Sequence, residues 1–494
     1  MRSSMPDKMK RLINCIISVS ACNFKCHYCY IGQTDGFKGT VETLPYSLEY
    51  IAYALRPGRV GEHCHIGICG AGETLLAPYL FDFLRLLTEQ GHYCSIVTNG
   101  SLSKRFDELY NLPVELRSHV FIKFSYHYLE LKRKNLLSVF WENVQKARSA
   151  GFAFTVELTV NDESIPYISE LQEDCLKNVG ANCHVIESRD NTTSEFTRLT
   201  KLPYLDHVQA WSQFESPIFP LQQETWGQKR HEFCYAGDWS ANFYLGTGDV
   251  YTCFADGQKI GNLYENPDLP FPFIAVGENC PWAHCFAAHV LLTSGIIPHF
   301  PAPTYAQVRD RTYTSSDNSI HTWLNPSFQA FFGSRFCESN GEYSKDKKAY
   351  INALMAVEHH NTQAKTDYCA VGEIVREHLH RKGIHKVAVC GTGEKAETII
   401  KILHAAKITI LFYVNPAEED NVPLTKKEQL KHRFSYLLHL LQQKNRNKVI
   451  QLTRLDYWPS VDAVIVSDHA DFFKIREQFS KQQRFMLSCL DLVD

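Results

Sequence analysis

The chain has 494 residues, of which 44% are hydrophobic, and a formal net charge of −3. This length and apolar content predict a globular protein of two to four domains. The balanced charge, without a lysine- or arginine-rich block, argues against nucleic acid or an acidic membrane surface as a partner. The N-terminal apolar run is short and lacks a cleavage pattern, and no apolar stretch approaches about 18 residues. We therefore expect a cytoplasmic protein without a signal peptide or membrane span.

The chain contains seventeen cysteines, a high number for its length. In a long chain without an evident secretion signal, cysteines are more typical of metal sites or buried apolar positions than of disulfides. Metal chemistry in a reducing compartment is therefore the leading expectation.

The first 190 residues alternate between strand-like and helix-like patterns. Apolar runs rich in β-branched residues predict strands at 12–20, 64–70, 93–98, 120–126, 153–160 and 183–187. Helical spacing of apolar residues predicts helices at 46–55, 79–89, 136–150 and 165–179. Such alternation implies parallel strands with right-handed crossovers, so we expect an α/β fold built on a partial (β/α)6 TIM-like barrel.

In barrels of this kind, chemistry is carried by the loops that follow the carboxyl ends of the strands. The first predicted strand is followed by "CNFKCHYC" at 22–29, and the second by "GAGE" at 70–73. Asn99 and Gly100 follow the third strand, and the fourth ends at 125–127. Four polar loops are therefore expected to meet at one rim of the barrel.

The triplet Cys22-x3-Cys26-x2-Cys29, with Tyr28 before its last cysteine, resembles the signature of radical S-adenosylmethionine (SAM) enzymes. The resemblance implies that the three thiolates bind three irons of a 4Fe–4S cluster and leave the fourth iron open to the amino and carboxylate groups of SAM. It further implies reductive cleavage of SAM to a 5′-deoxyadenosyl radical, which takes a hydrogen atom from the substrate. The alternative is a structural zinc site that borrows a fourth ligand such as His27.

Other rim residues can be matched to the same family. The segment 71–73 ("AGE") resembles its Gly-Gly-Glu loop, which binds the methionine amine, although Ala71 replaces the first glycine and Thr74 replaces the usual proline. Asn99 and Ser125 match polar positions that contact SAM in relatives, and Tyr28 would lie near the adenine. The resemblance thus assigns SAM binding to Tyr28, Gly72, Glu73, Asn99 and Ser125.

A second cysteine group lies at 234–285. Cys234 precedes a predicted hairpin whose turn is "GTGD", Cys253 follows it, and "CPWAHC" supplies Cys280 and Cys285. This pattern resembles the auxiliary-cluster domains called SPASM and twitch, and four cysteines suit one saturated auxiliary 4Fe–4S cluster. His284 and His289 leave a histidine ligand or a zinc site open.

The remainder of the chain is less specific. The pattern of residues 296–375 predicts an extended connection followed by a helix. Arg309 and Arg311 could meet an anionic substrate, but charges beside a proline-rich loop are more often solvated at the surface. From 376 onward, strand and helix alternate again, at 385–391, 397–406, 408–414, 462–468 and 484–490, which predicts a Rossmann-like α/β domain.

The C-terminal domain carries a glycine-rich turn between its first strand and helix. Gly391, Gly393 and Ala396 are spaced as in the dinucleotide fingerprint, in which glycines let a pyrophosphate approach a helix N-terminus. The second strand ends in Asn415, where NAD would favour an acidic residue. NAD, a nucleotide-sugar, and a docking or oligomerisation role therefore all remain open.

These expectations combine into one architecture, with a radical SAM core at 1–205, a twitch- or SPASM-like domain at 206–295, connecting loops and helices at 296–375 and a Rossmann-like domain at 376–494. The expected function is hydrogen abstraction that oxidises or epimerises a sugar or nucleotide-sugar, with a flavodoxin- or ferredoxin-type protein as reductant. The alternatives are a peptide maturase, disfavoured by the lack of an evident leader-binding module, and a zinc-stabilised binding protein without enzymatic activity. The pattern singles out no catalytic base or hydrogen donor.

Overall fold

The computed structural model describes residues 9–34, 36–254, 257–358, 368–391, 394–415, 449–451, 463–467 and 486–488. Contacts divide the chain into two units, Met1–Glu342 and Tyr343–Asp494. The unit boundary falls inside the predicted connection at 296–375, so its first part belongs to the first unit. No helix in the described residues is long and apolar enough to cross a membrane.

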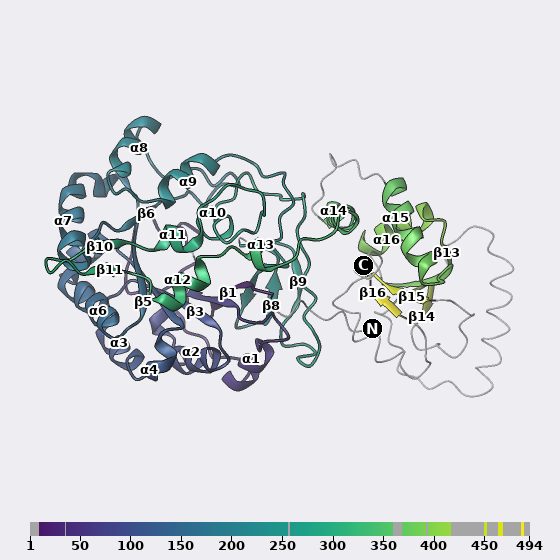
Figure 1. The fold of residues 1–494 in the computed structure, drawn as a ribbon, viewed down its shortest axis with the longest axis horizontal. Coiled ribbons are helices and arrows are strands. Elements are labelled where there is room, and N and C mark those ends of the chain that lie inside the picture. The colour runs from purple at the N-terminus through teal and green to yellow at the C-terminus, as the bar shows by residue number, and fades with distance from the viewer. Residues whose placement is uncertain are drawn as a thin grey trace. The chain divides into compact units, whose positions relative to one another are not determined.

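The first unit is organised around a nine-stranded sheet (Figure 1). Its first six strands are β1 (Leu12–Ile17), β2 (His65–Gly70), β3 (Tyr93–Thr98), β4 (Val120–Ser125), β5 (Ala153–Thr159) and β6 (His184–Ile186). They pair in sequence order and all run parallel, from β1 to β6. The expected six-stranded parallel core is therefore confirmed, and it is an open barrel because β6 is an end strand of the sheet.

The helices of this core lie on the outer side of the strands (Figure 1). They are α1 (Leu48–Ala54), α2 (Leu80–Glu89), α3 (Ser103–Leu109), α4 (Val114–Arg117), α5 (Tyr128–Arg133), α6 (Leu137–Ser149) and α7 (Ile168–Val179). In α7, Ile168, Leu171, Cys175 and Val179 are buried, as their helical spacing predicts. Short α3, α4 and α5 were not anticipated, because too few turns are present to establish a period.

Beyond the six-stranded core the sheet continues through β7 (Ser240–Tyr244), β8 (Asp249–Tyr251) and β9 (Lys259–Asn262). Strand β7 runs parallel to β1, and β8 and β9 add in antiparallel order. The predicted hairpin with its "GTGD" turn is thus confirmed as β7–β8. Before it lie α8 (Tyr204–Ser212) and α9 (Ile218–Thr225). The hairpin is joined directly to the barrel sheet through β1, and Cys253 of the second cysteine group follows β8.

The segment 296–342 is not the extended connection that its prolines suggest. It follows α10 (Ala288–Leu291) and contains α11 (Tyr305–Arg309), a hairpin of β10 (Thr312–Thr314) and β11 (Ile320–Thr322), α12 (Pro326–Phe332) and α13 (Phe336–Ser339). Its apolar side chains close one end of the barrel in a cluster made of Phe121, Ala153, Ile218, Tyr305, Val308, Leu324, Phe328, Phe331 and Phe332. Burial of this apolar surface against the strands explains why the segment folds back.

The same fold-back overturns the expectation for Arg309. Its side chain is 0% exposed and forms an ion pair with Glu157 of β5. Arg311 is also partly buried, and its guanidinium donates to the carbonyl oxygens of Phe214 and Glu215. Both arginines therefore attach the segment to the core instead of facing solvent.

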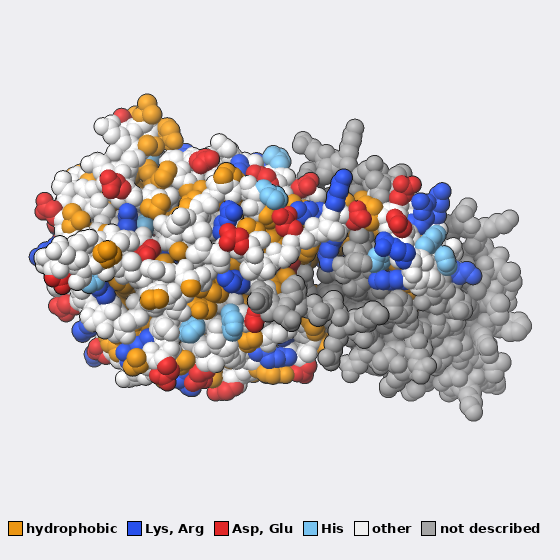
Figure 2. Space-filling view, in the orientation of Figure 1, with side chains coloured by type: hydrophobic (Ala, Val, Ile, Leu, Met, Phe, Trp, Pro, Cys, Tyr) orange, Lys and Arg blue, Asp and Glu red, His pale blue; other side chains and the backbone are white. Residues whose placement is uncertain are grey.

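Acidic and basic side chains are interspersed over the visible face of the first unit (Figure 2). This distribution agrees with the balanced charge of the sequence. Apolar side chains gather over α8, whose Tyr204 and Leu205 are 51% and 76% exposed.

The second unit contains a five-stranded parallel sheet in the order β14-β13-β12-β15-β16. Its strands are β12 (Lys386–Cys390), β13 (Thr409–Asn415), β14 (Val449–Gln451), β15 (Ala463–Val466) and β16 (Met486–Ser488), and its helices are α14 (Lys345–Glu358), α15 (Tyr368–Arg381) and α16 (Glu394–Ala405). All strand pairs are parallel, with β12 at the centre. The sheet has the strand order and direction expected of an α/β unit, while its ligand stays a prediction.

Candidate functional site

The cysteine triplet lies on the loop that follows β1, and its three side chains are partly exposed. The loop is a compact turn in which the backbone N–H of Cys29 donates to the carbonyl oxygen of Cys26 at 3.1 Å. Burial raises the pKa of the Cys26 thiol to about 12, and the neighbouring Cys29 and Glu130 add to the increase. Because thiolates are the ligand form, metal binding must displace these protons. Three thiols on one short loop fit the donor set of a site-differentiated cluster.

The loop after β2 packs directly against the triplet loop. The backbone N–H of Glu73 donates to the carbonyl oxygen of Ala21 at 2.8 Å, and a Cβ at Gly72 would collide with that same carbonyl group. Only glycine fits this contact, so Gly72 is required by close approach of two backbones. The contact holds the 70–73 loop beside the first cysteine.

The Glu73 carboxylate is 2% exposed and faces the protein interior. It accepts hydrogen bonds from Thr98 Oγ1 at 2.7 Å, the Asn99 N–H at 2.8 Å and the Leu75 N–H at 3.0 Å. These bonds join the loops after β2 and β3. Direct binding of the methionine amine by Glu73 stays a prediction, whereas its role in orienting Asn99 is visible in the structure.

Asn99 is tied to the triplet loop by a second set of hydrogen bonds. Its Nδ2 donates to Asn23 Oδ1 at 2.7 Å, Asn23 Nδ2 donates to Ser101 Oγ at 2.8 Å, and Ser101 Oγ donates to Asn99 Oδ1 at 2.6 Å. This closed network fixes the loop that carries Cys22 against the loop after β3. Contact between Asn99 and SAM stays a prediction.

Tyr28 connects the triplet loop to the end of β4. It is 6% exposed, and its hydroxyl group lies 2.9 Å from Nδ1 of His127. Burial lowers the pKa of His127 to about 4, so the imidazole is neutral near pH 7. Ser125, the last residue of β4, precedes His127 by two positions. The four predicted loops therefore meet at one rim, while the assigned SAM contacts of Tyr28 and Ser125 stay predictions.

The interior of the barrel holds an ionic cluster that the sequence did not indicate. Glu157 of β5 pairs with Arg309 of α11 and lies 3.4 Å from Lys123 Nζ of β4. Burial alone raises the pKa of Glu157, but Arg309 and Lys123 outweigh this effect and hold the pKa below its ordinary value. His289 lies near Glu157, and its pKa is lowered to about 3, mainly by burial. The cluster provides charged groups below the rim.

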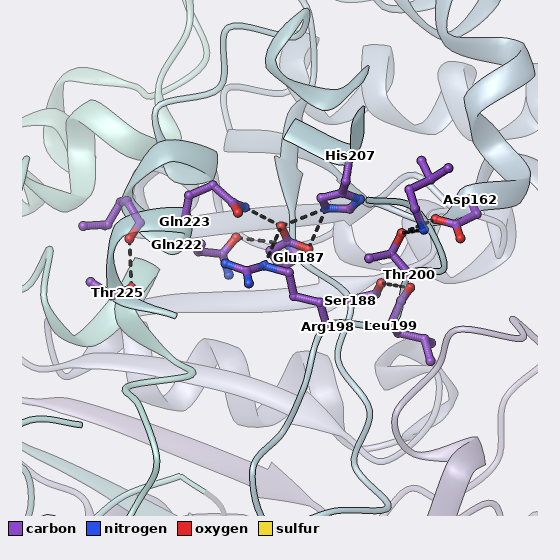
Figure 3. Close-up of polar contacts among 12 residues, drawn as sticks. Asp162, Glu187, Ser188, Arg198, Leu199, Thr200, His207, Gln222, Gln223 and Thr225 are labelled. Carbon is purple, nitrogen blue, oxygen red and sulfur yellow. Dashed lines mark hydrogen bonds and ion pairs between the residues drawn. The ribbon is translucent and has the colours of Figure 1, made fainter. Parts of the chain in front are cut away.

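A third buried carboxylate, Glu187, follows β6 (Figure 3). Its oxygens lie 3.0 and 3.1 Å from Nε2 of His207, and it also accepts from Gln223 Nε2. The Glu187 N–H donates to Gln222 Oε1 at 3.0 Å, and Arg198 Nε lies 3.6 Å from Glu187 Oε1. Glu187 thus joins β6, α8 and α9 and orients Arg198.

The four cysteines of the second group come from three separate segments and interact with one another. Burial raises the pKa of the Cys253 thiol, and Cys234, Cys285 and Cys280 add to the increase. Burial likewise raises the pKa of Cys280, while the positive charges of Lys229 and Arg230 oppose it. The fold thus brings these four thiols into one neighbourhood with two cations nearby, a donor set that fits an anionic cluster. The cluster itself stays a prediction.

His284 lies between the last two cysteines in sequence and is 1% exposed. Its ring packs against Trp226 with centroids 4.7 Å apart, and neither of its nitrogens has a hydrogen-bond partner. Burial, followed by the charges of Arg198 and Arg189, lowers its pKa to about 4. Within the described residues, no three His, Cys, Asp or Glu side chains are grouped tightly enough to hold a single metal ion.

The proposed nucleotide turn of the second unit is described in part. Gly391 has a φ of +131°, and a Cβ there would collide with the side chain of Ser467, which follows β15. Ala396 is 4% exposed within α16, and Gly393 lies outside the described residues. The conformation of Gly391 is therefore explained by close packing between neighbouring strand ends, and nucleotide binding stays a prediction.

Several contacts in and below the rim were not predicted because they join residues distant in sequence. Asn23 and Ser101 meet across 78 positions, Tyr28 and His127 across 99, and Glu157 and Arg309 across 152. Two signals in the sequence could have pointed to these contacts: Asn23 lies inside the triplet, and Glu187 ends a predicted strand. Neither signal identifies a partner without the fold.

Comparison with known families adds one specific match. Residues 16–173 match the radical SAM superfamily, and the match includes the triplet loop and the strands β2 to β5. No curated protein matches the sequence significantly.

Solved structures with a similar arrangement share low sequence identity with the chain. Streptococcus suis SuiB bound to S-adenosylmethionine has 15% identity and a TM-score of 0.38, with 55% of this chain and 66% of that chain covered. The enzyme anSMEcpe with bound AdoMet has 17% identity and a TM-score of 0.37, covering 52% and 75%. BtrN in complex with AdoMet and 2-DOIA has 18% identity and a TM-score of 0.30, covering 53% and 81%. The match spans just under two thirds of the length of SuiB.

Proposed function

We propose that residues 16–173, which match the radical SAM superfamily, form a radical SAM domain, and that the protein removes a hydrogen atom from a sugar or nucleotide-sugar, which it oxidises or epimerises. The observation that carries the proposal is the Cys22, Cys26, Cys29 triplet on the first loop of a parallel partial barrel. The substrate class is supported by the parallel α/β sheet of the second unit, a fold that commonly binds nucleotides.

In this proposal, Cys22, Cys26 and Cys29 hold a 4Fe–4S cluster and leave one iron free for SAM. When bound, the reduced cluster supplies the electron that splits SAM into methionine and a 5′-deoxyadenosyl radical. The residues of the chain would hold the cluster and SAM in position and exclude water from the site. Gly72 allows the second loop to lie against Ala21, and Glu73 orients Asn99, which holds Asn23 of the triplet loop.

The second cysteine group is proposed to hold one saturated auxiliary 4Fe–4S cluster. Support comes from the mutual proximity of Cys234, Cys253, Cys280 and Cys285 and from the nearby positive charges of Lys229 and Arg230. Such a cluster would accept an electron from the substrate radical during an oxidation. A flavodoxin- or ferredoxin-type protein is the proposed reductant.

The metal content tests both sites. Anaerobically reconstituted protein is expected to contain about eight irons per chain, and the Cys22/Cys26/Cys29 triple alanine variant about half as many. Cys337→Ser is the matched control, because Cys337 is partly exposed but lies outside both groups; it is expected to retain all the iron. Zinc in place of iron would favour the zinc-stabilised binding protein and end the enzymatic proposal.

Cleavage of SAM tests the reaction itself. Under reducing, oxygen-free conditions, the reconstituted protein is expected to release 5′-deoxyadenosine slowly without substrate, and the triple alanine variant is expected to release none. A reconstituted, iron-loaded protein that leaves SAM intact would contradict the proposal. Stimulation by a sugar-containing substrate supports the favoured substrate class, whereas stimulation by a ribosomal peptide would assign the maturase function instead.

A further inference from the structure

Two arginines beside the rim are held in an arrangement that costs stability. Arg189 and Arg198 face each other in an isolated antiparallel β-bridge. The flanking bonds, Asp190 N–H to Thr197 O at 2.8 Å and Leu199 N–H to Ser188 O at 3.1 Å, make this a non-hydrogen-bonded pair. In such pairs the side chains lie close together on the same face, and like charges opposite each other are destabilising.

The protein compensates one of these two charges with a carboxylate. Arg198 pairs with the buried Glu187 (Figure 3). Arg189 forms no ion pair within the described part of the chain; its Nε donates to Asn191 Oδ1 at 2.8 Å. Its guanidinium lies 4.5 Å from the ring centroid of Tyr30 and 4.7 Å from that of Phe286. One carboxylate for two guanidinium groups leaves a local positive excess.

The position of the pair relates it to both cysteine groups. Tyr30 directly follows Cys29 of the triplet, and Phe286 directly follows Cys285 of the second group. Arg189 therefore lies between the two segments that carry the cysteines. Lys229 and Arg230 are the cations that lower the pKa of Cys280. The pair Arg189 and Arg198 is therefore not explained as the counter-charge of the second cysteine group.

A third donor group, the imidazole of His284, is related to the pair through Trp226. Arg198 lies 5.0 Å from the ring centroid of Trp226, whose ring packs against His284. Both nitrogens of His284 are buried without a hydrogen-bond partner, whereas Nε of Arg198 faces the Glu187 carboxylate at 3.6 Å. Buried polar groups without partners are costly in a folded protein unless something else satisfies them. Arg189 and Arg198 are both partly exposed residues, and the Arg198 side chain is 22% exposed.

We propose that Arg189, Arg198 and His284 bind a phosphoryl group of the substrate. Two planar guanidinium groups and one imidazole match the three terminal oxygens of a phosphoryl group, and arginine binds such oxygens in bidentate geometry. The inference rests on the proposed function, since it assigns the site to the substrate of the radical reaction and narrows that substrate to one with a terminal phosphoryl group, such as a sugar phosphate.

Calorimetric titration of the reconstituted full chain with inorganic phosphate, at constant ionic strength, tests the assignment. Saturable binding is expected, and Arg189→Gln and Arg198→Gln are each expected to weaken it by about tenfold or more. Arg85→Gln is the matched control, because Arg85 is exposed on α2 and pairs with Glu89; it is expected to bind as the unmodified protein does. Arg189→Lys and Arg198→Lys retain the charge and report on binding if a glutamine variant does not fold.

Absence of phosphate binding by the unmodified chain would overturn the inference. So would phosphate affinities of Arg189→Gln and Arg198→Gln equal to that of the unmodified chain. A second titration uses malonate in place of phosphate. Tighter binding of malonate than of phosphate would assign the site to a carboxylate and overturn the phosphoryl assignment. Release of 5′-deoxyadenosine without substrate is measured in parallel. It is expected to be unchanged in Arg85→Gln, and its failure in the unmodified protein would contradict the proposed function without affecting the anion measurement.

Discussion

Gly72 lies so close to the triplet loop that a single methyl group would separate them. Because a Cβ would collide with the carbonyl group of Ala21, Gly72→Ala is expected to displace the loop and to abolish measurable SAM binding. Ala71→Gly, which introduces the glycine usual in the family, serves as the matched control and is expected to bind SAM normally. Equilibrium dialysis with SAM checks both variants, and tight binding by Gly72→Ala would contradict the proposed close contact.

Glu157 should make the stability of the protein depend on pH. Its pKa in the folded chain lies below the ordinary 4.5, so its ionised form contributes stability above pH 4.5 that is lost as the pH falls toward the folded pKa. Glu157→Gln leaves Arg309 buried without its partner, which is expected to cost about 3–5 kcal/mol at pH 7. Below pH 4.5, the difference from the unmodified protein should shrink by about 1.4 kcal/mol per pH unit.

Urea unfolding at pH 7 and at pH 3.5 measures this difference. Glu89→Gln is the control, since Glu89 forms an exposed ion pair on α2, and exposed pairs contribute roughly 0–1 kcal/mol. A stability difference for Glu157→Gln that stays constant between the two pH values would show that the carboxylate is not held ionised by Arg309 and Lys123.

The helix α12 stabilises the barrel by closing one of its ends. Phe328 is 0% exposed and packs within the cluster that includes Phe121 of β4. Phe328→Ala would create a cavity there and is expected to lower the free energy of unfolding by about 3–5 kcal/mol. Ile320→Ala in β11 is the control, because Ile320 is 74% exposed and its truncation should cost little. Similar losses in both variants would contradict the structural role of the segment.

The division of the chain into two units predicts that the first folds without the second. A fragment of residues 1–342 contains all seven cysteines assigned to clusters and the segment that closes the barrel. After reconstitution it is expected to bind the same amount of iron as the full chain and to release 5′-deoxyadenosine from SAM. Iron analysis and product quantification check this, and an insoluble fragment would show that residues 343–494 are required for folding of the first unit.

The local features of this protein are readable from its sequence. The strands from β1 to β6 follow from continuous apolar runs, and α7 follows from the spacing of Ile168, Leu171, Cys175 and Val179. The cysteine triplet is equally local, since its spacing places all three thiols on one turn. Short-range periodicity and spacing need no knowledge of distant residues, and therefore the six-stranded core and the resemblance of residues 16–173 to the radical SAM superfamily were both accessible.

The features that required the folded chain are those in which distant residues meet. The proline-rich composition around Arg309 suggests a solvated linker, but burial of Phe328, Phe331 and Phe332 brings the segment under the barrel and Arg309 into contact with Glu157. The opposition of Arg189 and Arg198 likewise depends on a β-bridge. The composition of a segment limits which local conformations it can adopt, but the burial of its apolar surface against the rest of the chain determines where it lies. Tertiary packing therefore decided where these charged groups lie relative to the rim.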